Sequence, residues 1–510
     1  MFKKIIKSKV LYLALAVLIQ LAALMLVATF FAFNFMSVYI FMIVLSVIAC
    51  IFVINRDSDS SSKLLWVLII MIMPFFGGFL YLLFGGRKIP KALMIQDRQA
   101  YSDYRKYAMQ NMKLLSQNDH PDPVLKKMTN MAWNNGYFPV YTHNKTRYFK
   151  TGAEQYETLL DALKEAEKFI FIETYIIDKG EMWDSIHEIL REKVAQGVDV
   201  RLVFDDFGSI LNVDDEFVRK LNEEGIKTHP FNRIRPQLAV QMNNRDHRKI
   251  IVIDGKKGFT GGSNIADEYI NKVERFGYWK DMGMMVEGSA VEPFTISFLQ
   301  IWNYSSEKNT PYEEFVLPPG QVPVFNNEPG FVLPFSDSPT DEHNLGKSMH
   351  LNMLAGAMDY CWISTPYLIL DDEMENALLL AVNNGVDVRI VVPGIPDKKI
   401  VYEVTKANIE HLVKKGVRVY EYTPGFIHGK VTLADGKQGL VGTVNMDFRS
   451  YYYNYECGTW MYETECLKDI HQDFEEIFAD SREVTMEDLK SINPIVRYAR
   501  NILKVFSPLL

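Results

Sequence analysis

The sequence predicts an α/β protein made of two copies of one α/β sandwich repeat, preceded by N-terminal transmembrane helices. Residues 1–84 contain three uncharged apolar runs, and the pentapeptide GVDVR occurs twice in the rest of the chain. Strand-like and helix-like segments alternate in the same order around each copy of this pentapeptide. Such alternation is typical of βαβ units, so we expect each repeat to contain a largely parallel sheet with helices on both faces.

The apolar runs cover residues 10–33, 35–54 and 64–84, and only Asn34 separates the first from the second. About 20 apolar residues suffice for a helix to cross a bilayer, so residues 1–91 are predicted to be a membrane anchor with two or three spans. The third run is interrupted by a proline and two glycines, so it could instead be re-entrant or interfacial.

Basic residues stand at both ends of this anchor, which leaves the side of the catalytic body open. Positive charge marks the cytoplasmic side of a span. The first end carries Lys3, Lys4, Lys7 and Lys9, and the second carries Arg87, Lys88 and Lys91. We therefore expect a multi-pass protein of the cell membrane without assigning its topology.

The charge is unevenly distributed along the chain. Residues 1–91 hold nine Lys and Arg and two Asp, a sum of +7, so the net charge of −8 leaves −15 for the remainder. Nucleic-acid affinity comes mostly from cationic contacts to phosphates, so an acidic body argues against a nucleic-acid partner. A basic rim around an apolar N-terminus fits a membrane surface better.

GVDVR at residues 197–201 and 385–389 marks an internal duplication. The predicted organisation of the chain is an anchor at 1–91, a helical connector at 92–134, a first repeat at 135–304, a linker at 305–344, a second repeat at 345–490 and an amphipathic C-terminal segment at 491–510. The last of these segments is expected either to lie in the head-group plane of a membrane or to pack on the domain.

Each repeat ends in one long motif. The first copy reads HRKIIVIDGKKGFTGGSN from His247 to Asn264, and the second reads HGKVTLADGKQGLVGTVN from His428 to Asn445. Both follow His-x-Lys, four residues, Asp, six residues, Gly-[Gly/Thr]-x-Asn. A single His-x-Lys would carry no weight, but a long pattern at equivalent places in two copies of a domain indicates one shared site.

The duplicated pattern resembles the phospholipase D superfamily, and the layout of nearly the whole chain resembles its bacterial cardiolipin synthases. Similar segments include NNRDHRKIIVIDGKKGFTGGSNIADEY at 243–269, YEYTPGFIHGK at 420–430 and VGTVNMDFRSYYYNYE at 441–456. The resemblance implies two phospholipase D-like sandwich repeats packed on a pseudo-twofold axis. It also implies that an acidic residue downstream of each motif orients a histidine, and the matching positions are Asp281 and Glu456.

The residue types suit phosphodiester exchange. A neutral imidazole is a competent nucleophile near pH 7, and a second, protonated imidazole can donate to the departing alkoxide. Lys249 and Lys430 would neutralise the phosphate oxygens, and Asn264 and Asn445 would add amide donors. By resemblance, His247 is the nucleophile and His428 the acid and base. We expect no metal and no cofactor, because the lysines supply the positive charge.

Four further residues complete the expected site. The motif aspartates, Asp254 and Asp435, belong to the catalytic motifs, and we interpret them as structural ties between strand and turn. Glu173 and Thr365, on the leading strands, are expected to line the substrate pocket, with simple strand packing as the alternative.

By resemblance, the chain joins two phosphatidylglycerol molecules into cardiolipin and releases glycerol through a phosphohistidine intermediate. The alternative is a membrane phospholipase D or another phosphatidyltransferase with a different acceptor, because a fold does not choose its substrate. A nuclease-like phosphodiesterase would need a basic cleft that the composition does not indicate. A catalytically inactive scaffold would tolerate loss of the motifs, yet both are complete. Acyl preference and homo-oligomeric state stay open.

Overall fold

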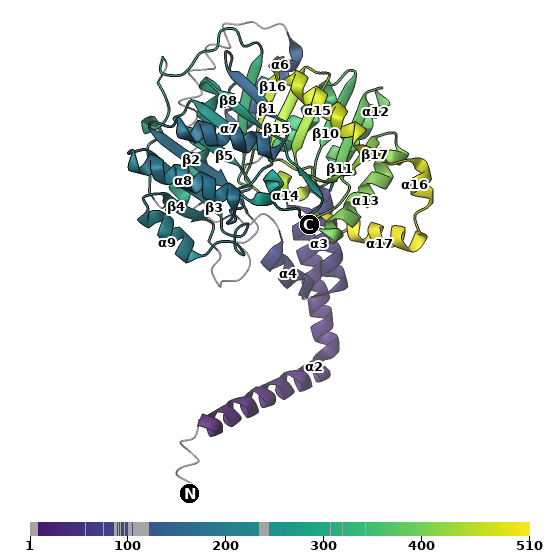
Figure 1. The fold of residues 1–510 in the computed structure, drawn as a ribbon. Coiled ribbons are helices and arrows are strands. Elements are labelled where there is room, and N and C mark those ends of the chain that lie inside the picture. Colours follow the sequence, from purple (N-terminus) through teal and green to yellow (C-terminus); the bar gives the residue numbers. More distant parts are fainter. Residues whose placement is uncertain are drawn as a thin grey trace. The chain divides into compact units, whose positions relative to one another are not determined.

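The computed structural model describes residues 9–509, apart from 57, 75, 86–88, 90, 92, 96, 100, 101, 103, 104, 106–121, 234–243, 307, 319 and 342. The basic residues 3, 4, 7, 87 and 88, and residues 106–121 of the predicted connector, lie outside the described residues. The chain divides into two compact units, Met1–Gly86 and Arg87–Leu510. Figure 1 shows the helices of the first unit and the sheets and helices of the second.

The described residues of the first unit form the helices α2 (Lys9–Ile54), α3 (Ser60–Ile72) and α4 (Phe76–Phe84). Helix α2 continues through Asn34, the residue that separates the first two apolar runs, for 46 residues in total. A lone asparagine costs a helix only a fraction of a kcal/mol, about 0.7 at most, and does not end it. The third apolar run does break near its proline, between α3 and α4.

One stretch among the described residues is long and apolar enough to cross a membrane, namely Phe35–Ile54. Helix α3 has 13 residues and is shorter than the ~20 that a span requires. It packs against both α2 and α4 around Trp66, Ile70 and Tyr81. Gly77 permits this packing, because a Cβ there would lie 2.6 Å from the carbonyl oxygen of Ile69.

The second unit contains two large sheets with the same strand order. The first runs β1-β8-β6-β5-β2-β3-β4 and the second runs β9-β16-β15-β14-β10-β11-β12, with β17 added at its edge. The strands of the first sheet are β1 (Lys145–Phe149), β2 (Phe169–Thr174), β3 (Asp199–Asp205), β4 (Lys227–Phe231), β5 (Ile250–Ile253), β6 (Lys257–Gly261) and β8 (Gly283–Glu287). Those of the second are β9 (Phe331–Asp337), β10 (Tyr360–Ser364), β11 (Asp387–Pro393), β12 (Arg418–Tyr422), β14 (Lys430–Ala434), β15 (Gln438–Gly442), β16 (Glu456–Tyr462) and β17 (Ser481–Glu483). The duplication therefore extends to the whole sheet.

The expectation of a largely parallel sheet is wrong. Only β2-β3-β4 and β10-β11-β12 pair in parallel, and the other pairs within the two large sheets are antiparallel. The antiparallel pairs β5–β6 and β14–β15 follow from a turn within each motif. Asp254 and Gly255 have φ of 53° and 65°, and Asp435 and Gly436 have φ of 54° and 63°. Two successive residues with positive φ form a type I′ turn, for which Asp-Gly is a strong signal.

Helices cover both sheets, as expected for an α/β sandwich (Figure 1). Those of the first repeat are α7 (Gly152–Lys164), α8 (Glu181–Ala195), α9 (Asp215–Glu223) and α10 (Glu292–Ser306). Those of the second are α11 (Leu345–Gly356), α12 (Asp372–Asn383), α13 (Lys399–Lys414), α14 (Phe448–Tyr452), α15 (Leu467–Ala479), α16 (Met486–Lys490) and α17 (Pro494–Lys504). Each helix between the parallel strands carries buried apolar residues, for example Trp183 and Leu190 on α8.

Two predicted boundaries shift in the structure. Strand β9 lies within the range assigned to the linker, so the second sheet begins before residue 345. Helix α6 (Pro123–Gly136), at the end of the predicted connector, packs against α11 and β9. Asp97, also in the connector, is buried and accepts hydrogen bonds from Gln300 and Tyr455 at 2.7 Å each. These connector residues are therefore part of the second unit, which is also called the catalytic unit below.

Candidate active site

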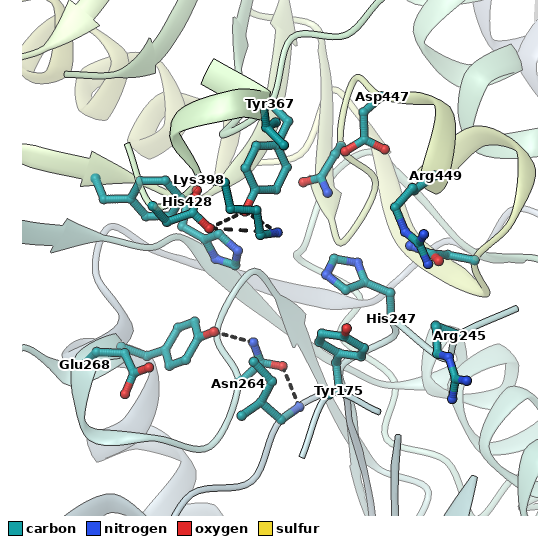
Figure 2. Close-up of a pocket in the computed structure, with 18 of the residues that line it drawn as sticks. Tyr175, Arg245, His247, Asn264, Glu268, Tyr367, Lys398, His428, Asp447 and Arg449 are labelled. Atoms are coloured by element: carbon teal, nitrogen blue, oxygen red, sulfur yellow. Dashed lines mark hydrogen bonds and ion pairs between the residues drawn. The ribbon is translucent and has the colours of Figure 1, made fainter. Parts of the chain in front are cut away.

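The two His-x-Lys motifs meet at one cavity of about 390 Å³. Both histidines and both motif asparagines line it. Figure 2 shows the rings of His247 and His428 directed into the same space. His247 stands three residues before β5 and His428 two residues before β14, so equivalent strands of the two repeats present them.

Backbone pairing between the repeats fixes this arrangement. Strand β7 (Tyr278–Lys280) of the first repeat pairs in parallel with β13 (Gly425–Ile427) of the second, and the His428 N–H donates to the Lys280 carbonyl at 2.8 Å. The equivalent contact on the other side joins the His247 N–H to the Tyr455 carbonyl at 3.0 Å. Each histidine is therefore tied to a segment of the opposite repeat.

The orienting carboxylates come from those same segments. Nδ1 of His247 lies 2.9 and 3.0 Å from the carboxylate oxygens of Glu456, and Nδ1 of His428 lies 2.8 Å from Asp281 Oδ2. A carboxylate on Nδ1 holds the proton there and leaves the Nε2 lone pair available. The pairing crosses the repeat boundary, and the spacing of the motifs alone gave no sign of it.

Burial governs the electrostatics of the histidines. It lowers the pKa of His428 to about 4, and the neighbouring Lys430 acts in the same direction against Asp281. Burial and then Lys249 and Lys430 hold the pKa of His247 well below its usual value. Both imidazoles are therefore neutral near pH 7 in the absence of a bound anion, as a nucleophile requires.

The two carboxylates differ from each other. Burial raises the pKa of Glu456 to about 7, although Thr443 and Ser450 donate hydrogen bonds to it at 2.5 and 2.8 Å. Burial also acts to raise the pKa of Asp281, but the charges and hydrogen bond of His428 and Lys430 outweigh it, and the net pKa is lowered. Asp281 is thus ionised under conditions in which Glu456 is half protonated.

The lysines lie beside their own histidines and are buried, and they are not among the residues that line the cavity. Lys249 Nζ donates to the His247 carbonyl at 2.7 Å, and Lys430 Nζ donates to the His428 carbonyl at 2.6 Å. Burial lowers the pKa of Lys249 to about 8 and that of Lys430 to about 7. A bound phosphate anion would favour the charged form of both.

The second lysine has an additional contact. Lys430 Nζ lies 2.9 Å from Nε2 of His428. Among the described residues, no hydrogen bond joins Lys249 to the His247 ring. The second repeat therefore holds a proton donor next to its imidazole, and this is the main difference between the two motifs.

The two motif asparagines occupy equivalent positions in the sequence, but their hydrogen bonds differ. Asn264 donates to the Tyr269 hydroxyl at 2.5 Å and accepts from the Ile176 N–H at 3.0 Å. Asn445 Oδ1 is buried and has no hydrogen-bond partner among the described residues. Both amides reach the cavity, where they could contact phosphate oxygens.

The motif aspartates lie at the far end of their strands from the cavity and do not line it. Asp254 accepts from the N–H groups of residues 167, 168 and 169 at 2.7–2.9 Å, and Asp435 accepts from those of 358, 359 and 360 at 2.8–2.9 Å. Each aspartate therefore connects the hairpin turn to the start of the adjacent strand, β2 or β10.

The expected pocket positions of Glu173 and Thr365 are wrong, because neither residue lines the cavity. Glu173 is fully buried and forms an ion pair with Arg248 Nε at 2.7 Å. Thr365 Oγ1 accepts from the Met446 N–H at 3.2 Å and so supports the loop that carries Asn445.

Several lining residues escaped the sequence analysis. Tyr175 follows β2 and Tyr367 follows β10, but the register of the two repeats aligns Tyr367 with Ile176, so a comparison of the repeats would not have paired the two tyrosines. The Tyr175 ring lies 5.2 Å from that of His247. Lys398 and Arg449 also line the cavity from the second repeat, and no equivalent residues in the first repeat could have indicated them.

A duplicated α/β fold that brings two His-x-Lys motifs to one cavity defines a phosphotransfer enzyme of the phospholipase D type. The sequence profile described as cardiolipin synthase, PLD-like domain, matches residues 159–298 and 351–478. A second profile, described as phospholipase D-nuclease N-terminal, matches residues 44–86.

Full-length relatives agree with this match. The chain is 40% identical over 465 residues to an uncharacterized protein of Streptococcus mutans, covering 90% of this chain and 99% of that protein. It is 33% identical over 466 residues to cardiolipin synthase 2 of Bacillus anthracis, covering 90% and 88%. The solved structure of phosphatidylserine synthase from Haemophilus influenzae has the same fold, with a TM-score of 0.59, 15% identity and coverage of 75% of this chain and all of that one.

The chain belongs to the cardiolipin synthase family of proteins with paired phospholipase D-like domains. The predicted resemblance, fold class and enzyme class are thereby confirmed: the chain is a membrane-associated phosphatidyltransferase of phospholipid biosynthesis.

Proposed function

We propose that this chain transfers a phosphatidyl group from one phosphatidylglycerol to a second, giving cardiolipin and glycerol. The observation that carries the proposal is the pair of histidines, each held on Nδ1 by a carboxylate and each lining the same cavity. Such a pair supports two successive displacements at one phosphorus atom.

In the first displacement, Nε2 of His247 attacks the phosphorus, and the bond from phosphorus to the head-group glycerol oxygen breaks. Binding of the anionic phosphate favours the protonated form of His428, which then donates its proton to the departing glycerol alkoxide. The enzyme then carries a phosphatidyl group on His247, and the first product is glycerol. The two lysine ammonium groups would offset the charge on the phosphate oxygens throughout this step.

In the second displacement, His428 removes the proton from a terminal glycerol hydroxyl of another phosphatidylglycerol. The alkoxide oxygen attacks the phosphorus, the bond from phosphorus to nitrogen breaks, and cardiolipin leaves. His247 returns to its neutral form and His428 to its protonated form. The cycle is balanced and consumes no cofactor.

The assignment of roles rests on the asymmetry of the two motifs. An acid and base must hold and release a proton, and the ionised Asp281, 2.8 Å from Nδ1 of His428, stabilises the imidazolium form of that histidine. His247 has a partner, Glu456, whose pKa of about 7 gives less stabilisation to an imidazolium. These contacts favour His247 as nucleophile.

We also propose that the anchor is multi-pass. Helix α2 contains the candidate span, and α3 and α4 pack against each other as an apolar, proline-broken pair. In bacterial membranes, labelling of cysteines placed at Ser61 and Gly85 with an impermeant reagent would test this. Labelling of the two cysteines from opposite sides supports a second crossing by α3 and α4. Labelling of both from the same side would indicate a re-entrant α3–α4 pair and would contradict the proposal.

The function itself is tested by product analysis. Purified chain is mixed with phosphatidylglycerol vesicles without added metal, and the lipids are resolved by mass spectrometry. The proposal predicts cardiolipin and free glycerol in equal amounts. Phosphatidic acid without cardiolipin would mean that water is the acceptor and would contradict the proposal.

A further inference from the structure

Two loops at the cavity mouth expose large apolar side chains. They follow β3 and β11, which occupy equivalent places in the two sheets. The first loop exposes Phe207, Ile210 and Leu211, and Leu211 is 94% exposed. The second exposes Ile395, and Ile400 follows at the start of α13 with 62% exposure. Because apolar side chains are exposed at the same place in both repeats, the two loops are expected to share a function.

Helix α17 has its polar side against the protein and its apolar side in solvent. Arg497 and Arg500 form ion pairs at 2.7 and 2.6 Å with Glu410 and Glu403 of α13. Ile495 and Tyr498 are 78% and 70% exposed. A surface helix of a soluble protein normally has the opposite arrangement.

Both features are continuous with the active-site cavity. Phe207, from the first loop, lines it directly, and so do Lys398 and Val401, which flank Ile400. Leu503 of α17 packs on a cluster that includes Ile369, another lining residue. The exposed apolar residues of the two loops and of α17 are named here the apolar rim: Phe207, Ile210, Leu211, Ile395, Ile400, Ile495 and Tyr498.

We propose that the apolar rim is the surface by which the catalytic unit enters the lipid bilayer, so that a head group reaches the histidines while its acyl chains stay in the membrane. This inference rests on the proposed function. A cavity of about 390 Å³ lies at the small end of the range for drug-sized ligands, about 300–1,000 Å³, so it suits a head group and not whole lipids. Removing acyl chains from the bilayer costs about 0.8 kcal/mol per CH₂, which excludes transfer through water.

The residues beside the rim favour an anionic lipid surface over a second copy of the chain. Lys398 and Arg275 line the cavity and are 60% and 59% exposed. Each has a carboxylate of the lining beside it, Asp397 at 3.9 Å from Lys398 and Glu268 at 2.7 Å from Arg275. Cations beside apolar and aromatic side chains match the head-group and interfacial layers of a bilayer that contains anionic lipids. Tyr498 would lie at head-group depth for the same reason.

The test places an environment-sensitive fluorophore at single cysteines of the full chain in proteoliposomes that contain phosphatidylglycerol. The variants are Leu211→Cys and Tyr498→Cys, with Met358→Cys as the matched control. Met358 is also an exposed apolar residue, at 80%, but it precedes β10, whereas the cavity lies beyond the other end of that strand. The native cysteines are buried, and labelled wild type gives the background.

The proposal predicts a blue-shifted emission at 211 and 498, with at least about twofold quenching by lipids that carry a shallow spin label, and neither effect at 358. Emission at 211 and 498 that resembles that at 358 would overturn it. A blue shift without quenching would place another protein surface there and would overturn it as well. These readouts do not require turnover.

Activity supplies a second test. Leu211→Glu should lower cardiolipin formation about tenfold in proteoliposomes and leave it within about twofold in detergent micelles, where no bilayer must be entered. Met358→Glu should change neither. Equal loss in both media would contradict the inference, whereas failure of wild type to make cardiolipin in either medium would contradict the proposed function instead.

Discussion

The two halves of the active site share a strand order, a motif and a hairpin turn, yet they surround their histidines differently. His428 has an ionised aspartate on one ring nitrogen and a lysine 2.9 Å from the other. His247 has a glutamate with a pKa of about 7 and a lysine that bonds the backbone instead. Duplication therefore supplies two equivalent positions, and the side chains around them divide the work between a nucleophile and an acid and base.

Removing either histidine should have the largest effect. His247→Ala and His428→Ala should each lower cardiolipin formation by at least about 10³-fold, because the two groups act as a unit and their losses are not additive. The double variant should be no worse than about threefold below either single one, as measured by product formation under identical lipid conditions. Near-normal activity of either variant would contradict a two-histidine mechanism.

The orienting carboxylates should come next. Glu456→Gln and Asp281→Asn should each lower kcat by about 10²-fold or more, since the amide favours the wrong tautomer of its histidine. With a substrate that carries a p-nitrophenyl leaving group, which needs no acid, only Glu456→Gln should slow the first displacement. If Asp281→Asn slowed the first displacement more than Glu456→Gln did, His428 would be the nucleophile and His247 the acid and base.

The lysines should give the enzyme an alkaline limb. Lys430 and Lys249 have pKa values of about 7 and 8 before substrate binds, and both histidines titrate at lower pH. Phosphate binding needs the charged lysines, so KM should rise as pH increases, by at least about tenfold per unit above pH 8.

Glu456 also titrates near pH 7, so a variant must separate the two contributions. Lys430→Arg stays charged throughout and should flatten the KM profile even where its kcat is lower. A profile of Lys430→Arg that rises as steeply as that of wild type would assign the alkaline limb to another group.

The motif aspartates should affect stability more than chemistry. Asp254→Asn weakens an acceptor that three backbone N–H groups share, which should lower the free energy of unfolding by about 1–3 kcal/mol. The activity per folded molecule should stay within about threefold of wild type. Asp435→Asn is the matched variant in the second repeat, and a stable but inactive protein in either case would contradict a structural role.

Much of this site could be predicted because the motif repeats. The two copies led to the prediction of both histidines, both lysines, both asparagines and the motif aspartates, and the apolar runs led to the prediction of the anchor. The antiparallel half of each sheet could have been predicted as well, since Asp254–Gly255 and Asp435–Gly436 are hairpin signals.

Other features depend on contacts between distant segments. Glu456 orients His247 only because the Tyr455 carbonyl accepts from the His247 N–H across the repeat boundary, a pairing without sequence signature. Glu173 alternates along β2 like any core residue, and only its pairing with buried Arg248 explains why a carboxylate lies there and not in the pocket. Helix α2 likewise continues through Asn34, because a single asparagine destabilises a helix only weakly. The residue pattern does not indicate whether the helix ends there.

The division of labour between the histidines is tested most directly by a single-turnover experiment on His247→Ala and His428→Ala with the p-nitrophenyl ester of phosphatidic acid. The account predicts that His428→Ala releases one equivalent of p-nitrophenol in a burst, and that neutral-quench mass spectrometry finds the phosphatidyl group on His247. His247→Ala should give no burst. A burst from His247→Ala with the adduct on His428 would contradict the assignment.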